Sequence, residues 1–375
     1  MRCTHRRCDI LIIGAGVVGC AIARTMAIAF PGKQIVVVEK NPLPGQETSR
    51  LNSNVIHSGL HESSGSLKER FARRGSRLIV EYALNNGLEI NKTGMIIAVP
   101  WKSAFADPIG KYEAATLLRQ NAKRQKINVE FLNWRNIKKY EPNIKAMCGV
   151  FIPNVWIVDA ESLVAKMHSD AVCKNVDFYF DNAVVGIDPK SGVYEVSTPS
   201  LKIQAGAVVN AAGLYADKVA AMAGLNYQTE FWRGEYYEVS ASKAGLIRRL
   251  VYPVISSGSP SKGIHFSPRL SGRLFIGPNA RLVLSRSDYN EDKTSVNMFH
   301  EAASQFCPQI KLEDLGWAYS GIRPKVKNWQ SNSDFSIKLD IGDPPFLNLI
   351  GIESPGLTAS MAIAEYVEEL LGPRL

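Results

Sequence analysis

A glycine-rich turn between an apolar strand and an apolar helix constrains the fold of this chain most strongly. Residues 8–13 form an apolar run that predicts a buried strand, and residues 18–30, rich in Ala, Ile and Met, predict a helix. The turn between them is Gly14-Ala15-Gly16-Val17-Val18-Gly19. Its glycines permit a tight turn and close approach to a pyrophosphate, which the positive N-terminal end of the helix attracts. The segment therefore predicts a dinucleotide-binding strand-turn-helix.

A second apolar strand, residues 35–38, follows the helix and ends at Glu39-Lys40. Glu39 lies twenty residues past Gly19, where a carboxylate accepts hydrogen bonds from ribose hydroxyls and repels a 2′-phosphate. An ordinary glycine turn is the alternative interpretation. Strand, helix, second strand and acid nevertheless occur in the order of a dinucleotide site, which favours the nucleotide interpretation.

The C-terminal segment 351–358 suggests that the chain returns to the same ligand. It joins a predicted strand, 346–350, to a predicted helix, 358–371, and ends in Pro355-Gly356-Leu357-Thr358. Backbone amides at such a helix start can face a flavin pyrimidine, where negative charge grows on reduction. A plain capped helix is the alternative. Binding from both ends of a chain favours a tightly held flavin dinucleotide over an exchangeable nicotinamide.

The order of predicted elements indicates the domain organisation. A βαβ start, a mixed insert, a β-rich return, a second insert and a final βα unit predict an α/β fold. We expect a Rossmann-like FAD-binding domain, interleaved with a second, mainly antiparallel-sheet α+β substrate domain. The first comprises residues 1–88, 148–226 and 319–375, and the second comprises 89–147 and 227–318.

Several elements have local start signals. Ser66-Leu67-Lys68-Glu69 predicts a capping box for a helix that ends before Gly87. Asp159 can cap a helix over 160–172, and residues 296–306 also predict a helix. Residues 231–239 and 263–277 favour strands. The long loop 42–65, rich in Gly, Ser, Asn and His, has the character of a functional segment.

Bulk composition limits the remaining classes. The 375 residues carry a formal charge of +9, but the basic residues are scattered and form no RNA- or DNA-binding module. Six cysteines without a CxxC pair fit a reducing, cytoplasmic compartment. We expect no cleavable presequence and no transmembrane segment, while peripheral contact with an inner membrane stays open.

Four internal segments add to the two ends of the chain. They are Thr48-Ser49-Arg50-Leu51-Asn52-Ser53, Val184-Val185-Gly186-Ile187, Val208-Val209-Asn210-Ala211-Ala212-Gly213-Leu214-Tyr215-Ala216-Asp217 and Ser320-Gly321-Ile322-Arg323-Pro324. Over nearly its whole length the chain thus resembles FAD-dependent oxidoreductases of the D-amino-acid oxidase and glycerol-3-phosphate dehydrogenase type. The resemblance implies FAD contacts from the loop residues Thr48, Ser49, Asn52 and Ser53. It implies further contacts from Val184, Ala212, Gly213 and Gly321.

A narrower resemblance rests on four other segments. They are Asn52-Ser53-Asn54-Val55-Ile56-His57-Ser58-Gly59, Gly65-Ser66-Leu67-Lys68, Arg233-Gly234-Glu235-Tyr236-Tyr237, and Gly263-Ile264-His265-Phe266-Ser267-Pro268-Arg269 with Ile276-Gly277-Pro278-Asn279-Ala280. These are similar to L-2-hydroxyglutarate dehydrogenases (oxidases). The resemblance implies FAD-dependent oxidation of an L-2-hydroxy acid to the 2-oxo acid. The chain departs from that family at Asn54, where the family has Gly, at His61-Glu62, and in a shorter insert over 281–319.

Such an oxidation needs a base for the hydroxyl proton. His57 follows the flavin loop and has a near-neutral reference pKa, which makes it the first candidate. His265, on an alternating strand, is the competitor, and each histidine could instead be structural. His57 and His61 lie in a Ser-Gly turn with no further ligand set, so we expect no metal.

The substrate carboxylates need cations. Arg269 and Arg323 are candidates for bidentate carboxylate binding. Arg233 is a third, although an ion pair with Glu235 or another acid is the favoured interpretation for it. The expected substrate is a small acid, 2-hydroxyglutarate or a related dicarboxylate. An enzyme oxidising amino acids or glycerol 3-phosphate is the alternative, and a flavin-binding RNA-modification protein is a third hypothesis. Quinone, oxygen and a carrier protein remain equal candidates for the electron acceptor.

Overall fold

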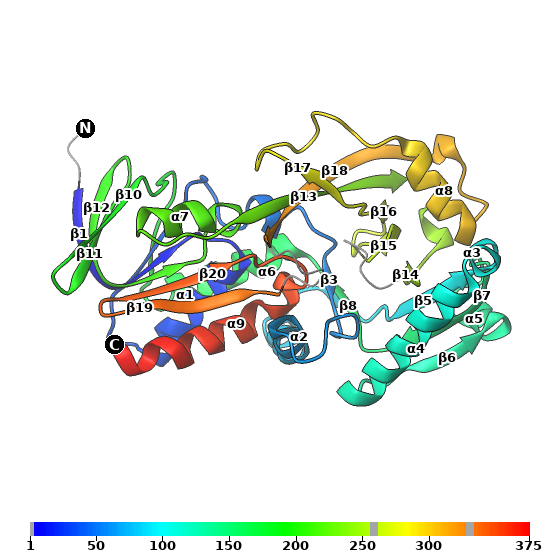
Figure 1. Ribbon diagram of the computed structural model, residues 1–375, viewed down its shortest axis with the longest axis horizontal. Helices are drawn as coiled ribbons and strands as arrows, with labels where there is room; N and C mark the ends of the chain where they lie inside the picture. Colours follow the sequence, from blue (N-terminus) through cyan, green and yellow to red (C-terminus); the bar gives the residue numbers. More distant parts are fainter. Residues whose placement is uncertain (1–3, 256–261, 328–333) are drawn as a thin grey trace.

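The computed structural model describes residues 4–255, 262–327 and 334–375, except the side chains of 104–106. Two units lie end to end along the long axis of the molecule (Figure 1). One is built on a sheet with parallel strands flanked by helices, and the other on a larger mixed sheet. This arrangement confirms the predicted α/β fold with a second unit of mainly antiparallel strands.

The eight-stranded sheet forms the first unit, in the order β10-β11-β12-β1-β2-β9. β1 lies in its middle, parallel to both β12 and β2. The second half of β12 also pairs with β20, which in turn pairs with β19. The strands are β1 (Thr4–Ile13), β2 (Ile35–Val38), β9 (Asp177–Tyr179), β10 (Gly186–Lys190), β11 (Val193–Ser197), β12 (Leu201–Asn210), β19 (Ser336–Gly342) and β20 (Pro345–Ile350).

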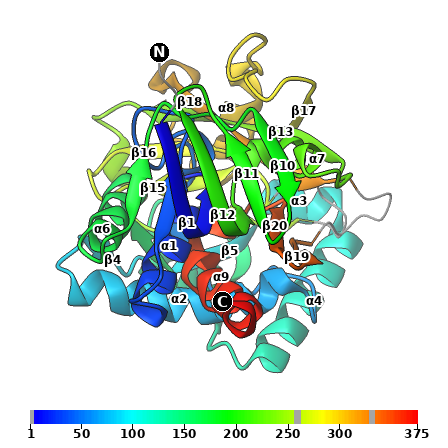
Figure 2. The ribbon, with the colours of Figure 1, turned by 90° about the vertical axis from the view of Figure 1, so that its left-hand side faces the viewer.

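Helices pack against this sheet because its strands are apolar on both faces. α1 (Val17–Ala29), α6 (Ala160–Val172) and α9 (Gly356–Leu371) pack together below it, and α7 (Ala216–Met222) lies across the other face (Figure 2). Ile10 and Ile12 of β1, Ile22 and Met26 of α1, and Ile363 of α9 are fully buried in the resulting core. The N-terminal and C-terminal segments of the chain therefore share one core.

The nine-stranded sheet forms the second unit, in the order β17-β13-β16-β15-β14-β5-β7-β6, with β18 on β13. All of its pairs are antiparallel except β14 with β5. The strands are β5 (Met95–Pro100), β6 (Glu130–Asn133), β7 (Ala146–Ile152), β13 (Thr229–Val239), β14 (Leu250–Pro253), β15 (His265–Pro268), β16 (Leu274–Gly277), β17 (Arg281–Val283) and β18 (Leu315–Val326).

Further helices accompany the second sheet and the junction between the units (Figure 1). They are α2 (Leu67–Asn85), α3 (Trp101–Ala106), α4 (Pro108–Gln125) and α5 (Trp134–Tyr140), and α8 (Val296–Phe306) packs near the far end. A short sheet of β3 (Val55–Ile56), β8 (Trp156–Val158) and β4 (Ile90–Asn91) lies between the two large sheets.

Sheet membership corrects two of the expected domain boundaries. The limit at 147/148 falls inside β7, and the limit at 318/319 falls inside β18, yet both strands belong entirely to the second sheet. The sequence marks both segments as extended, but strand partners come from tertiary pairing. The division into two domains is otherwise retained as a proposal.

The predicted helix starts are confirmed at Asp159 and Ser66, where a side chain caps the helix. Asp159 accepts a hydrogen bond from Ser162 N at the start of α6, and α6 and α8 have the expected bounds. Ser66 likewise accepts from Glu69 N. The expected reciprocal half of the capping box is wrong, since the Glu69 carboxylate accepts from Gly65 N. Ser66 N already donates to the Ser63 carbonyl in the preceding turn.

Candidate active site

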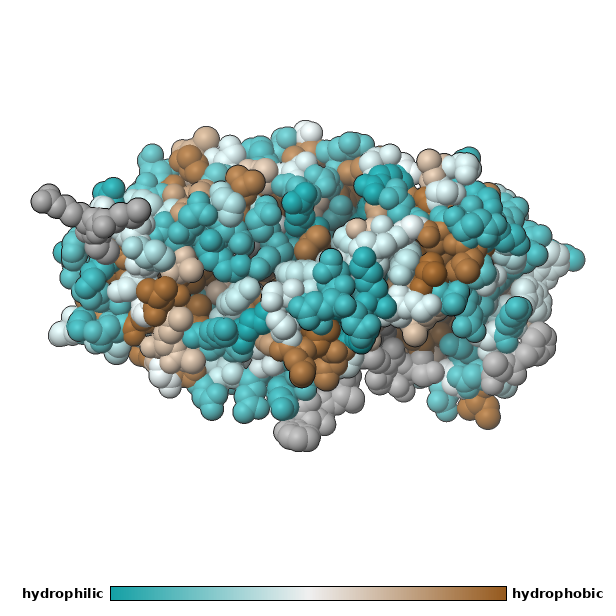
Figure 3. All heavy atoms as spheres, turned by 90° about the horizontal axis from the view of Figure 1, so that it is seen from above, coloured by the Kyte–Doolittle hydropathy of each residue, from teal (hydrophilic) through white to brown (hydrophobic). Residues whose placement is uncertain are grey.

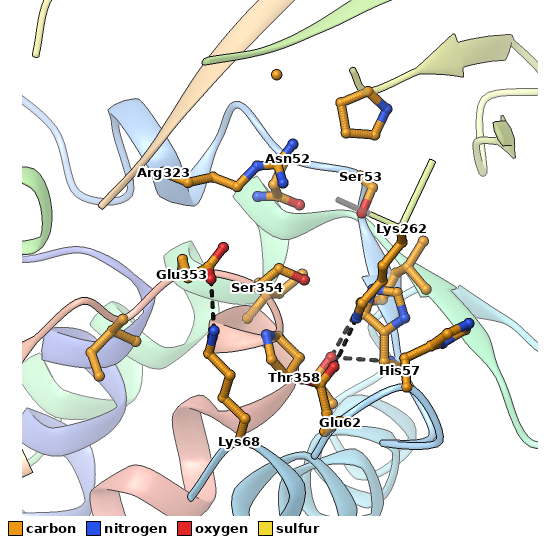
Figure 4. Close-up of a pocket in the computed structure, with 18 of the residues that line it drawn as sticks. Asn52, Ser53, His57, Glu62, Lys68, Lys262, Arg323, Glu353, Ser354 and Thr358 are labelled. Atoms are coloured by element: carbon orange, nitrogen blue, oxygen red, sulfur yellow. Dashed lines mark hydrogen bonds and ion pairs between the residues drawn. The ribbon is translucent and has the colours of Figure 1, made fainter. Parts of the chain in front are cut away.

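A cavity of about 470 Å³ lies where the two units meet. Its lining comes from the start of α1, the loop before β3, the starts of α2 and α9, and from α4, β13 and β18 of the second unit. Figure 4 shows polar and charged side chains from these separate segments converging on it. Concave sites between units, with a few convergent polar groups, are typical of ligand binding.

The predicted glycine turn forms one end of this cavity. Gly14 has φ +104°, and a Cβ there would lie 2.6 Å from the Ala211 carbonyl oxygen. A Cβ on Gly19 would lie 1.9 Å from the Gly14 carbonyl oxygen, so neither position accepts a side chain. Gly16 begins α1 without a side-chain cap and lines the cavity with Val17 and Val18. The exposed positive end of α1 fits an anionic pyrophosphate.

Glu39, at the end of β2, forms a hydrogen bond with the glycine turn. Its carboxylate accepts hydrogen bonds from Ala15 N at 2.8 Å and from Asn41 N at 2.9 Å. The Glu39 side chain is buried and is not part of the cavity lining. Lys40, which forms an ion pair with Glu47, is not part of the lining either. The structure therefore gives Glu39 a role in shaping the turn in addition to the expected ribose contact, which remains a prediction.

The loop 48–53, for which flavin contacts are expected, is hydrogen-bonded to β18 and packs closely against it. Thr48 Oγ1 donates to the Ile322 carbonyl, and Asn52 Nδ2 donates to the Ser49 carbonyl. A Cβ on Gly321 would lie 1.9 Å from the Leu51 carbonyl oxygen, so this glycine allows the strand to approach the loop. Thr48, Ser49, Asn52, Ser53 and Gly321 all line the cavity.

The residue after this loop explains one departure from the resembling family. Asn54 has φ +56°, in the left-handed region that favours glycine and tolerates asparagine. Its backbone N–H donates to Asn52 Oδ1. Asn54 therefore preserves the backbone shape that a glycine would allow.

The C-terminal segment reaches the same cavity. Pro355, Gly356, Leu357 and Thr358 all line it, and α9 begins without a side-chain cap. Thr358 Oγ1 accepts a hydrogen bond from His57 N at 3.0 Å and donates to the Val55 carbonyl (Figure 4). Two helix N-termini from opposite ends of the chain thus open on one cavity, which fits a cofactor with a pyrophosphate and an electron-accepting ring.

The remaining residues with expected cofactor contacts differ in whether they line the cavity. Gly213 lines the cavity, while its neighbour Ala212 lies just behind the lining. Val184 lies outside the cavity and packs against the core of the eight-stranded sheet. Their expected contacts remain predictions.

His57 is buried in the cavity wall. Burial lowers its pKa well below the ordinary value of 6.5, and the nearby Lys262, His61 and His265 lower it further. Because the shift favours the uncharged form, His57 is neutral around pH 7 and has a lone pair available for a proton.

His265 is held more tightly than His57. Its Nδ1 lies 2.7 Å from the Gly263 carbonyl oxygen, and its ring stacks on Tyr252 at 3.6 Å between centroids. Burial lowers its pKa to about 3. Since a carbonyl only accepts, Nδ1 carries the proton, and the buried Nε2 has no partner among the described residues.

Strand register separates two of the three candidate arginines, Arg233 and Arg323. In the β13–β18 pair, Gly234 lies opposite Gly321 and Trp232 opposite Arg323, and these partners share one face of the sheet. Arg323 lines the cavity on that face, and its Nη2 donates to the Asn279 carbonyl. Arg233 lies opposite Ile322 on the other face.

Arg233 and Arg269 therefore have other surroundings. Arg233 is fully buried between Glu235 and Asp288, with both of which it forms ion pairs, and it does not line the cavity. The structure contradicts its assignment to substrate binding and supports the alternative ion pair with Glu235. Arg269 also lies outside the lining, where its Nη2 donates to the Asn52 carbonyl and to Tyr319. Arg269 thus contacts the loop 48–53 through the Asn52 carbonyl.

Two charged clusters in the cavity were not singled out in the sequence. Lys262 forms an ion pair with Glu62 at 2.9 Å, beside His57 (Figure 4). Lys68 forms an ion pair with Glu353 at 2.6 Å, and its side chain is only 12% exposed. The departure at His61-Glu62 was the available signal for the first cluster, but its lysine partner lies two hundred residues away.

The part of the chain that the structure describes lacks both a metal-binding cluster and a membrane-spanning helix. No group of three or more His, Cys, Asp or Glu side chains is placed to hold a metal ion there. Within the same residues, no helix combines the length and apolar character required to span a bilayer.

Comparison with known proteins places these features in a family. L-2-hydroxyglutarate dehydrogenase, mitochondrial, from Arabidopsis thaliana is 28% identical over 96% of this chain and 83% of its own length. Glycerol 3-phosphate dehydrogenase from Caloramator mitchellensis is 27% identical over 97% of this chain and 73% of its own.

Among solved structures, the dithionite-reduced L-α-glycerophosphate oxidase from Mycoplasma pneumoniae with FAD bound superposes with a TM-score of 0.87. It is 26% identical and covers 98% of this chain, and this chain covers 95% of it. The sequence pattern of the FAD dependent oxidoreductases (DAO) matches residues 9–370. With its glycine turn, its two helix N-termini on one cavity and this match over almost its full length, the chain belongs to the FAD-dependent oxidoreductase family.

Proposed function

We propose that this enzyme oxidises the hydroxyl-bearing carbon of a small L-2-hydroxy acid, specifically a dicarboxylate such as L-2-hydroxyglutarate. The observation that supports the proposal best is the position of neutral His57 in a cavity whose lining includes Arg323 and, in an ion pair with Glu62, Lys262. Figure 4 shows Arg323 beside Asn52 and Lys262 beside His57, on two sides of the same cavity. Two separated cations suit a substrate with two carboxylates.

Each residue has a defined part in this proposal. His57 accepts the hydroxyl proton as the C2–H bond breaks and the C2–O bond becomes a carbonyl. Bound FAD supplies the acceptor for the hydride that leaves C2. Arg323 binds the carboxylate next to C2 with its planar guanidinium, and Lys262 attracts the distal carboxylate. Arg269, through the Asn52 carbonyl, keeps the loop 48–53 in position.

Glycerol 3-phosphate is the second candidate substrate. The Mycoplasma and Caloramator proteins, whose names refer to glycerol phosphates, are as similar to this chain as the hydroxyglutarate dehydrogenases are. A phosphate monoester could occupy the same cationic end of the cavity as a carboxylate. An amino acid is a third candidate, since Glu62 and Glu353 also line the cavity and could pair with its ammonium group.

A substrate panel tests the proposal. The purified holoenzyme is mixed anaerobically with L-2-hydroxyglutarate, its D-enantiomer, L-lactate, glycerol 3-phosphate and glycine, and flavin bleaching is followed. We expect the fastest reduction with L-2-hydroxyglutarate and a much slower one with its enantiomer. Fastest bleaching by glycerol 3-phosphate would establish the second candidate. A flavin that none of these compounds reduces would refute both.

Replacement of Glu39 tests the cofactor end of the site. We expect Glu39→Ala to weaken FAD binding roughly ten- to hundredfold, since a charge-assisted hydrogen bond contributes about 1.5–3 kcal/mol. The expected loss of affinity has two causes. The ribose contact disappears, and the Ala15 amide loses its hydrogen-bond acceptor. FAD titration of the apoprotein measures it, and circular dichroism checks that folding is retained. Glu301→Ala, at an exposed position of α8, is the matched control. Equal FAD affinity in the two variants would contradict the assignment.

A further inference from the structure

The segment that includes α3, α4, β6 and α5 carries most of the net charge of the molecule. Residues 101–145 contain ten Lys and Arg against four Asp and Glu, a net charge of +6 out of the +9 of the whole chain. The sequence as a whole looks evenly basic, but the excess is concentrated in 45 residues at one end of the molecule (Figure 1).

The same segment exposes large apolar side chains. Ile109 and Tyr112, at the start of α4, are 73% and 75% exposed, and Phe131 and Trp134 are about half exposed. Other exposed apolar residues, such as Leu43 and Leu84, are spread over the rest of the chain. On the face seen from above in Figure 3, hydrophobic residues lie in small groups between hydrophilic ones. Single exposed apolar residues are normal, but a concentration of them requires an explanation.

Cationic groups lie directly over the exposed rings. The guanidinium of Arg119 lies 5.4 Å from the centre of the Phe131 ring, which places α4 beside β6. The guanidinium of Arg135 lies 5.1 Å from the Trp134 ring. Tyr112 is seven residues before Arg119 and therefore lies on the same face of α4. We call Ile109, Tyr112, Arg119, Phe131, Trp134 and Arg135 the basic aromatic surface.

We propose that the basic aromatic surface docks this enzyme on an anionic lipid bilayer. Aromatic and aliphatic side chains enter the boundary between headgroups and acyl chains, while neighbouring Lys and Arg attract anionic headgroups. The net charge of +6 on residues 101–145 is complementary to the negative charge of an anionic bilayer. This combination of bulky apolar and basic groups, on a surface without a transmembrane helix among the described residues, is the composition of an interfacial contact.

A single-stranded nucleic acid would also be attracted by the positive charge, but the rings argue against it. Base stacking needs an open aromatic face. The Phe131 ring is covered by Arg119, and the Trp134 ring has both Arg135 and Lys138 within 6 Å. Exposed Ile109 adds apolar area that bases do not use but acyl chains do.

The surface is adjacent to the active-site cavity. Ala114, Leu118 and Asn121 of α4 line the cavity from the other side of the helix, and Leu117 both lines it and is half exposed. A docked α4 would therefore place this wall of the cavity near the bilayer. An electron acceptor dissolved in the membrane would then approach the enzyme from that side.

Vesicle co-sedimentation of the FAD-loaded protein tests the proposal. We expect binding to vesicles of phosphatidylcholine with phosphatidylglycerol, little binding to pure phosphatidylcholine, and a decrease with added salt. Arg119→Glu with Arg135→Glu should lower the affinity for anionic vesicles by at least about tenfold, since each surface cation contributes on the order of 1 kcal/mol. Ile109→Ser with Tyr112→Ser should lower it at every salt concentration.

The controls change equivalent residues on other elements. Leu284→Ser removes a highly exposed apolar side chain, and Lys174→Glu reverses an exposed charge after α6. We expect vesicle binding of both to equal that of the wild type, and flavin reduction by soluble substrate to be unchanged in all variants. Absence of wild-type binding to anionic vesicles, equal loss in the controls, or stronger retention by single-stranded RNA than by vesicles would each overturn the proposal.

Discussion

Replacement of His57 by Gln is expected to lower the rate of flavin reduction by roughly a hundred- to ten-thousandfold, the range for loss of a general base. We expect substrate affinity to change only a few-fold, because Arg323 and Lys262 remain in the cavity. His57 N still donates to Thr358, since that hydrogen bond uses the backbone. Anaerobic stopped-flow mixing at several substrate concentrations separates the reduction rate from the dissociation constant.

His265→Gln is the comparison that decides between the two histidines. Its Nδ1 is held by the Gly263 carbonyl and its ring by Tyr252, so we expect this variant to lose affinity or stability before it loses the reduction step. A larger loss of reduction rate in His265→Gln than in His57→Gln would make His265 the base.

The pH dependence of the wild type follows from the pKa of His57. Burial and the neighbouring Lys262 hold this pKa well below 6.5, so the neutral form persists as the pH falls through 6.5. We therefore expect the reduction rate to stay level down to that pH. A decline with its midpoint at 6.5 would mean that His57 is not buried in this way, or that another group is the base.

Arg323→Lys is expected to lower kcat/KM by roughly ten- to hundredfold, the equivalent of about 1.5–3 kcal/mol for a charge-assisted contact. Lysine keeps the charge but lacks the planar pair of donors that fits a carboxylate. The effect should fall mainly on substrate binding, because no proton passes through the guanidinium. Single-turnover flavin bleaching at varied substrate concentration measures it.

Arg269→Lys is the matched variant, because its guanidinium lies outside the cavity lining. It contacts the Asn52 carbonyl, so we expect a smaller loss, expressed in the flavin absorbance spectrum and in FAD retention. Wild-type rate and affinity in both variants would remove the main support for a dicarboxylate substrate. A larger loss of substrate affinity in Arg269→Lys would make Arg269 the anchor.

Local sequence determined much of the fold. The order of strand, glycine turn, helix, strand and Glu39 fixed the nucleotide-binding unit, because each part depends on near neighbours. Asp159 and Ser66 located helix starts for the same reason. β19, by contrast, was not expected. Its residues 337–341, Ile-Lys-Leu-Asp-Ile, alternate apolar and polar side chains, which is a local signal for a half-buried strand, and the segment pairs with β20 at the sheet edge.

The sequence by itself determined the FAD-binding fold and predicted that segments 48–53 and 355–358 lie at its ligand site, and both segments line the cavity. Only the tertiary structure decided which charged side chains face the cavity. Arg233 and Arg323 were both candidates in sequence, but the β13–β18 register places them on opposite faces of the sheet. Lys262 meets Glu62, and Lys68 meets Glu353, across separations of two hundred residues or more. Side-chain direction and long-range pairing arise from packing, and the local pattern of residues does not encode them.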